Sequence, residues 1–80
     1  MAIVYILRCQ KIPAKHYVGF TKDLMKRLEA HNALKSSFSK KYSPWEVETY
    51  ITFKNEVKAR VFEKYLKHGS GHAFLKKNLI

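Results

Sequence analysis

The chain has 80 residues, with 16 Lys and Arg against six Asp and Glu, and a formal net charge of +10 at pH 7. A chain of this length folds as one domain with a thin core, so an active site should be a shallow groove. The apolar fraction, 46%, is too high for a disordered basic tail. We expect one folded domain over residues 1–80 whose charge attracts a polyanion, nucleic acid above all, with solubility as the alternative explanation of the charge.

The cysteine content and the N-terminal segment bear on the compartment. Cys9 is the only cysteine, so no disulfide forms within the chain, and it is expected to be a small buried strand residue. The apolar run at residues 2–7 is too short for a signal peptide and has no basic residues before it. No segment combines a broad apolar face with a basic one, as a membrane-surface helix would. A cytoplasmic protein with no membrane partner is therefore expected.

The first half of the chain predicts two strands and a helix. Residues 2–8 are β-branched and aromatic, as in a strand buried on both faces, and residues 16–20 should return beside them as a hairpin. Thr21 or Asp23 can cap a helix that runs to about Asn32. The expected inner side of this helix carries Leu24, Met25, Leu28 and Asn32.

The second half predicts one strand and two helices. Residues 33–44 show no period and indicate a loop, whereas residues 45–53 alternate apolar and polar types, as in a strand with one buried face. Asn55 can cap a helix, Gly69 suits the left-handed position that ends it, and Ser70 can start a short last helix. The order β-β-α-β-α-α predicts an α+β fold with a small three-stranded antiparallel sheet flanked by helices. The apolar stripe expected on the second helix is Val57, Val61, Phe62, Tyr65 and Leu66.

Polar residues lie beside both predicted apolar stripes. Arg27 and His31 are about 40° apart on a helical wheel, and Glu63 lies just outside the stripe of the second helix. We expect all three at the rim of the core, where packing supports a side chain that still reaches solvent. Taken singly, Arg27 is more often a solvated cation, and Glu63 could simply pair with Lys67 at i+4.

The spacing of these residues along the chain is more informative than any one of them. Two tripeptides lie on the first two predicted strands, and two further motifs lie on the helices: Ile3-Val4-Tyr5, Tyr17-Val18-Gly19, Arg27-Leu28-Glu29-Ala30-His31 and Phe62-Glu63-Lys64. This arrangement resembles the GIY-YIG nuclease superfamily, and in particular its small stand-alone single-domain bacterial members. Ile3 and Val4 depart from the Gly and Ile of the family pattern, while Gly19 remains where close backbone approach or a positive φ is needed.

The resemblance implies a metal-dependent endonuclease that hydrolyses phosphodiester bonds in DNA, in repair or recombination. It implies that Glu63 binds a divalent cation, Mg²⁺ or Mn²⁺, and that Arg27 stabilises the charge that grows on the phosphate. It further implies that Tyr17 accepts a proton from the attacking water, that His31 relays or polarises this proton, and that Tyr5 orients the water or the phosphate.

Lysines near these motifs are expected to contact the nucleic-acid backbone, and nothing resembles a recognition helix or zinc finger. Structured or damaged DNA is therefore the expected substrate, recognised by shape or with a protein partner. Two alternatives stay open: a non-catalytic nucleic-acid-binding module that keeps the nuclease fold, and an RNA-binding protein. The expected backbone contacts are Lys22, Lys40, Lys41, Lys64 and Lys67.

Overall fold

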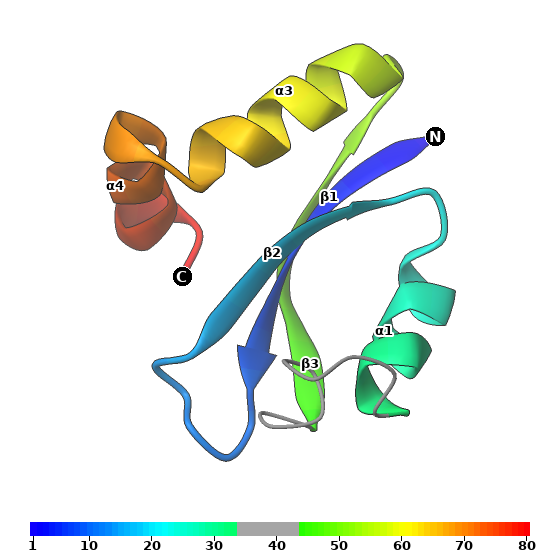
Figure 1. Ribbon diagram of the computed structural model, residues 1–80, viewed down its shortest axis with the longest axis vertical. Coiled ribbons are helices and arrows are strands. Elements are labelled where there is room, and N and C mark those ends of the chain that lie inside the picture. Colours follow the sequence, from blue (N-terminus) through cyan, green and yellow to red (C-terminus); the bar gives the residue numbers. More distant parts are fainter. Residues whose placement is uncertain (34–43) are drawn as a thin grey trace.

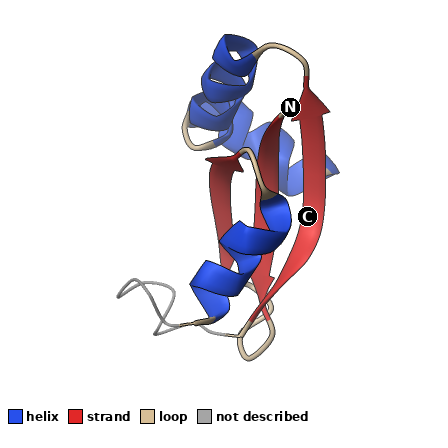
Figure 2. Ribbon diagram, turned by 90° about the vertical axis from the view of Figure 1, so that its right-hand side faces the viewer, coloured by secondary structure: helices blue, strands red, loops and turns tan. Residues whose placement is uncertain are grey.

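The computed structural model describes residues 1–33 and 44–80, which form a three-stranded sheet with helices on both faces (Figure 1). The central strand β1 pairs antiparallel with β2 and with β3, in the order β2-β1-β3. Helices α3 and α4 cover one face of the sheet, and α1 covers the other (Figure 2). The predicted α+β class and element order are confirmed. The elements are β1 Ala2–Cys9, β2 His16–Thr21, α1 Leu24–Asn32, β3 Trp45–Phe53, α3 Glu56–Leu66 and α4 Gly69–Asn78.

The central strand β1 is buried on both faces, as its sequence predicts. Val4 and Ile6 pack in the cluster under α3 and α4, and Tyr5 and Leu7 pack in the cluster under α1. All four side chains are at most 1% exposed. Because successive strand residues point to opposite faces, a continuous apolar run is what a strand between two helical layers requires.

Strand β3 does not bury a single face, and this part of the sequence prediction was wrong. The register changes along β1, where Ile6 pairs with Thr49 but Leu7 pairs with Val47, so Glu48 is an extra residue. A bulge of this kind moves the residues beyond it to the other face of the sheet. Val47 therefore packs on the α1 side, whereas Phe53 packs on the α3 side.

Side chains cap the first two helices as expected. The Asp23 carboxylate accepts a hydrogen bond from the Lys26 N–H at 3.1 Å, and the Asn55 amide oxygen accepts one from the Lys58 N–H at 3.0 Å. Each satisfies a donor that the first helical turn leaves without a partner. Gly69, the first residue of α4, has φ +52°, the left-handed conformation predicted for it.

The buried side of α3 differs from the apolar stripe in its sequence. Ala59 and Leu66 are fully buried, whereas Val57 and Val61 are 70% and 62% exposed. Phe62 is partly buried against the same cluster as Ala59 and Leu66. The face at positions 59, 62 and 66 meets the sheet, and the small side chain of Ala59 lets the helix approach closely. The predicted stripe is thus correct only at Phe62 and Leu66.

The side of α1 that faces the sheet also differs from the predicted one. Leu24 and Leu28 do pack against the sheet, but Met25 is 64% exposed and His31 is the buried residue of the helix. Asn32 is exposed, yet its amide accepts a hydrogen bond from the Trp45 N–H at 2.6 Å and donates one to the Trp45 carbonyl at 3.1 Å. These two bonds join the end of α1 to the start of β3.

No helix within the described part of the chain is long and apolar enough to span a membrane.

Candidate active site

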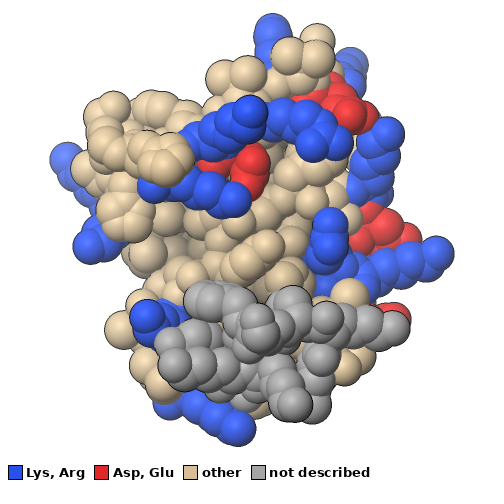
Figure 3. Space-filling model, in the orientation of Figure 1, with Lys and Arg blue, Asp and Glu red and all other residues tan. Residues whose placement is uncertain are grey.

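Four of the five residues expected to be catalytic line one pocket of about 410 Å³, namely Tyr5, Tyr17, Arg27 and Glu63. They come from β1, β2, α1 and α3, and the pocket lies where the edge strand β2 passes between α1 and α3. We call it the carboxylate pocket. Lys and Arg side chains surround acidic ones on this face of the molecule (Figure 3). Side chains from four separate elements thus converge on one polar concave surface.

Tyr5 lies against Gly19, its partner on the neighbouring strand. A Cβ atom at Gly19 would be 2.4 Å from the Tyr5 hydroxyl oxygen, so the tyrosine ring occupies the space that any other side chain would need. Glycine is required here because the Tyr5 ring lies so close to the backbone, and not because of a positive φ. Burial raises the pKa of the Tyr5 hydroxyl above its usual range, with the neighbouring Tyr17 adding to the shift. Tyr5 therefore keeps its proton at neutral pH.

His31 lies behind the two tyrosines and not at the rim, so its predicted position was wrong. It is 7% exposed, its Nε2 is 3.2 Å from the Tyr5 hydroxyl oxygen, and its ring centroid is 4.6 Å from that of Tyr17. Positions 24, 28 and 31 share one helix face, which places His31 against the sheet with the two leucines. Burial, with a smaller effect of the Arg27 charge, lowers the pKa of His31, so the ring is neutral at physiological pH.

Glu63 faces the carboxylate pocket from α3, on the side of the helix that meets the sheet. Its side chain is only 15% exposed, and its carboxylate pairs with the Lys67 ammonium one turn further along the helix. The sequence allowed a simple ion pair between Glu63 and Lys67, and this pair is present. Glu63 still lines the carboxylate pocket while it is paired.

Arg60 also lines the carboxylate pocket, and the sequence motifs did not single it out. Its guanidinium lies over the Phe20 ring, 4.2 Å from the ring centroid, and its Nε is 3.2 Å from a Glu56 carboxylate oxygen. The sequence could have indicated Arg60, because it is three residues before Glu63 and residues at that spacing share a helix face. The pocket therefore contains two guanidinium groups, from Arg27 and Arg60.

The lysines expected to contact nucleic acid differ in their surroundings. Lys22 lines the carboxylate pocket and its ammonium is 2.9 Å from a Glu56 carboxylate oxygen, while Lys67 pairs with Glu63. Lys64 is exposed on α3. The remaining two, Lys40 and Lys41, lie outside the described residues.

The carboxylate pocket offers one carboxylate to a metal ion. Mg²⁺ commonly binds through one or two carboxylates, keeps several of its waters and touches substrate phosphate, so a single partly exposed glutamate in an open polar pocket fits such an ion. Residues 1–33 and 44–80 contain no group of three or more His, Cys, Asp and Glu placed to hold a metal. The donors present suit a hydrated hard cation at Glu63 and not a structural zinc site.

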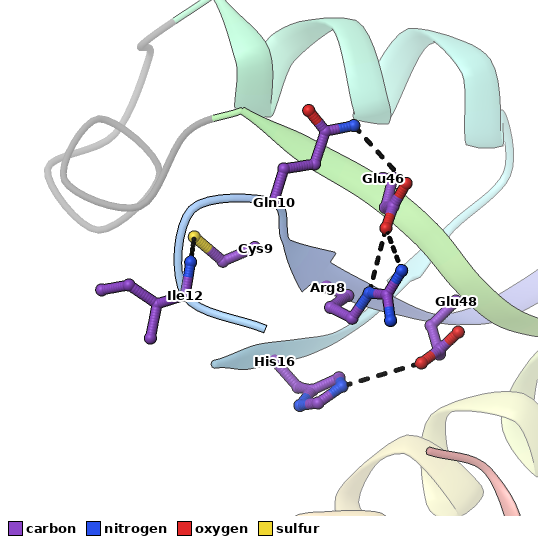
Figure 4. A network of polar contacts seen from close by, with 7 residues as sticks. All are labelled: Arg8, Cys9, Gln10, Ile12, His16, Glu46 and Glu48. Atoms are coloured by element: carbon purple, nitrogen blue, oxygen red, sulfur yellow. Dashed lines mark hydrogen bonds and ion pairs between the residues drawn. The ribbon is translucent and has the colours of Figure 1, made fainter. Parts of the chain in front are cut away.

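A second polar cluster lies at the hairpin end of the sheet (Figure 4). The Arg8 guanidinium binds a Glu46 carboxylate oxygen from the neighbouring strand, with Nε to Oε1 at 2.9 Å, and Gln10 contacts the other oxygen at 3.4 Å. Cys9 is fully buried beside it, and its Sγ accepts a hydrogen bond from the Ile12 N–H at 3.3 Å. This cluster joins β1 to β3, and Cys9 is the buried strand residue that its sequence context predicts.

A comparison of the chain with protein families connects this geometry to a known group. None of the curated protein sequences compared with the chain matches it significantly. A family model described as the GIY-YIG catalytic domain matches residues 1–77, which include every element of the sheet and the carboxylate pocket. The chain therefore belongs to the GIY-YIG family, a family of nucleases.

Proposed function

We propose that this protein is a divalent-metal-dependent endonuclease that hydrolyses phosphodiester bonds in DNA, in repair or recombination. The observation that carries the proposal is the convergence of Tyr17, Arg27 and Glu63 on the carboxylate pocket. Hydrolysis of a phosphodiester needs groups that neutralise negative charge and one that handles a proton, and this set provides both kinds. Membership of a nuclease family supplies the reaction class.

Two guanidinium groups are available for the phosphate. Arg27 is exposed at the pocket wall, so it can donate hydrogen bonds to a phosphate that enters from solvent. Its planar array of donors matches two phosphate oxygens at once, which a lysine cannot do. Arg60 is held over the Phe20 ring and supplies a second positive charge on the α3 side. Both charges favour the transition state, in which negative charge on the phosphate grows.

The two tyrosines have different roles in this proposal. Tyr5 is 1% exposed and burial raises its pKa, so it serves as a neutral hydrogen-bond donor that holds its neighbours in place. Tyr17 is half-buried on the pocket wall, and we assign to it the acceptance of a proton from the attacking water. His31 contacts Tyr5 and the Tyr17 ring from behind, which makes it a positioning residue.

Glu63 would hold the divalent cation, Mg²⁺ or Mn²⁺, on which nucleases of this family generally depend. When bound there, such a cation supplies Lewis acidity toward a phosphate oxygen. The Glu63 carboxylate has to exchange its ion pair with Lys67 for the cation, and this frees the lysine for a phosphate on the neighbouring nucleotide.

A cleavage assay separates an enzyme from a binding module. Branched, nicked and plain duplex DNA are each incubated with the protein and Mg²⁺ or Mn²⁺, beside Glu63→Gln and the matched control Glu29→Gln. Both substitutions remove one negative charge, but Glu29 is exposed on α1 and does not line the pocket. We expect metal-dependent cleavage that falls at least about a hundredfold in Glu63→Gln and is unchanged in Glu29→Gln. Binding without cleavage by the unmodified protein would favour the non-catalytic module, and a preference for matched RNA would contradict a DNA substrate.

A further inference from the structure

A second pocket lies next to the carboxylate pocket, on the α4 side of β2, and has a volume of about 390 Å³. We call it the apolar pocket. Tyr17 lines both pockets, and Lys67 lines the apolar pocket while its ammonium pairs with Glu63 of the other. A nucleic-acid strand with one phosphate at Glu63 would therefore reach the apolar pocket with an adjacent nucleotide.

The lining of the apolar pocket combines three kinds of side chain. Val18 and Ile80 provide accessible apolar surface above the buried Leu66 and Leu75, and the pocket also has two imidazole rings and three lysines. Within the described part of the chain, no Asp or Glu lines it. The rings are those of His16 and His72, and the lysines are Lys15, Lys67 and Lys76.

The nearby acidic residue Glu48 lies on β3, where its carboxylate oxygen is 4.0 Å from the His16 Nε2 (Figure 4). The Glu48 carboxylate lies near the His16 ring without a hydrogen bond to it, and Glu48 is not one of the lining residues. Of the three lining lysines, Lys67 pairs with Glu63, so the lining keeps a net positive charge, which favours an anionic occupant.

We propose that the apolar pocket binds one unpaired nucleotide of the DNA that occupies the carboxylate pocket, a proposal that rests on the function proposed above. Apolar surface and imidazole rings suit the flat face of a nucleobase, and lysines suit the phosphate attached to it. A paired duplex presents its phosphates but keeps its base faces stacked, so the apolar lining is of use only for an unpaired base. The volume lies within the range of about 300–1,000 Å³ that is typical of small-molecule sites.

The proposal also assigns a substrate class to the nuclease. DNA with a bulge, flap or junction offers an unpaired nucleotide beside a paired region, whereas an intact duplex does not. The nuclease then prefers such DNA because the apolar pocket contributes binding that a duplex cannot use. This preference needs no recognition helix, since stacking accepts any base.

Binding of three DNAs of equal length, measured by fluorescence anisotropy in EDTA, tests the proposal without cleavage. One DNA is a plain duplex, one has a bulge of three unpaired thymidines, and one has the same bulge with abasic sites, which keeps the phosphates but removes the bases. The unmodified protein should bind the thymidine bulge at least about fivefold more tightly than the abasic bulge. Equal affinity for the two bulges would overturn the proposal.

Two pairs of variants locate the effect. His72→Ala should lose the preference for bases over abasic sites, whereas His68→Ala should keep it, because His68 does not line the pocket and makes no capping hydrogen bond through its side chain. Lys76→Glu and Lys77→Glu change the net charge equally on adjacent residues of α4, but only Lys76 lines the pocket. Lys76→Glu should weaken binding of the thymidine bulge more than Lys77→Glu does. Indistinguishable variants within each pair would contradict the proposed site.

These binding results are separable from the nuclease test. If Glu63→Gln and the unmodified protein both fail to cleave, the endonuclease is refuted, while a base preference that depends on His72 would still establish the nucleotide site. If cleavage is found and His72→Ala behaves as His68→Ala, the endonuclease stands and the nucleotide site is refuted.

Discussion

Gly19→Ala probes the contact on which the position of Tyr5 depends. The new Cβ would lie 2.4 Å from the Tyr5 hydroxyl oxygen and 2.5 Å from the ring carbon that carries it. Ordinary contact between such atoms is about 3.5–4.0 Å, so the end of the ring has to move by roughly 1 Å. Tyr5 is 1% exposed and its hydroxyl contacts His31, so a displaced ring loses packing and its contact with His31.

Two opposing effects set the magnitude of the change in stability. Overpacking in a filled core costs about 1–3 kcal/mol. Replacing glycine by alanine restores about 0.4–1 kcal/mol by restricting the unfolded chain. The free energy of unfolding should therefore fall by about 0.5–2 kcal/mol, and the melting temperature by a few degrees to about 15 °C for a domain of this size.

Thermal unfolding, monitored by circular dichroism, measures the stability of the variant. Cleavage of branched DNA with Mn²⁺ measures the activity of the carboxylate pocket. Gly69→Ala is the control, because nothing lies within 4 Å of its added Cβ but its φ of +52° makes alanine unfavourable. A non-glycine residue in that conformation costs about 1–2 kcal/mol, so both variants lose similar stability. We expect cleavage to fall only in Gly19→Ala. A Gly19→Ala protein as stable and active as the unmodified one would refute the reasoning.

Three further predictions concern the packing of the helices. Asn32→Ala removes both hydrogen bonds to Trp45 and should lower the free energy of unfolding in urea by about 1–3 kcal/mol; a change below about 0.5 kcal/mol would contradict this. Leu66→Ala should cost about 2–5 kcal/mol in the same assay and Val61→Ala less than about 0.5 kcal/mol, and a larger cost for Val61→Ala would show that Val61 faces the sheet. Burial lowers the pKa of His31 in the folded protein, so the unfolded chain binds that proton more readily and stability is lost as pH falls below about 6.5. The unfolding free energy of His31→Gln should thus decline less between pH 7 and pH 5 than that of the unmodified protein. Equal declines would contradict a lowered pKa of His31 in the folded protein.

Local sequence signals predicted the elements of this fold well. The caps at Asp23 and Asn55 and the alternation over residues 45–53 depend on neighbours along the chain, and the corresponding elements begin where expected. The bulge at Glu48 could not be predicted in the same way, because it depends on how β3 pairs with a distant strand. One extra residue there changes which face its apolar side chains occupy.

Helix orientation was harder to predict than helix position. The sequence stripe of α3 contains large apolar residues, yet the sheet contacts the face that carries Ala59, because a small residue allows close packing. His31 was expected at the rim because the helical wheel was taken to place it beside the stripe of Leu24 and Leu28, but these leucines share its face and bring it under the sheet. The convergence of Tyr17, Arg27 and Glu63 followed from the family resemblance, since no local pattern relates residues so far apart.

A double-substitution cycle on single-turnover DNA cleavage tests most directly whether Arg27 and Glu63 act on one phosphate. Rates are measured for the unmodified protein, Arg27→Ala, Glu63→Gln and the combined variant with Mn²⁺. Groups that serve the same transition state are strongly non-additive, so the combined variant should be little slower than the slower single variant. A combined loss equal to the product of the two single losses would mean that the residues act independently, and would contradict a single active site in the carboxylate pocket.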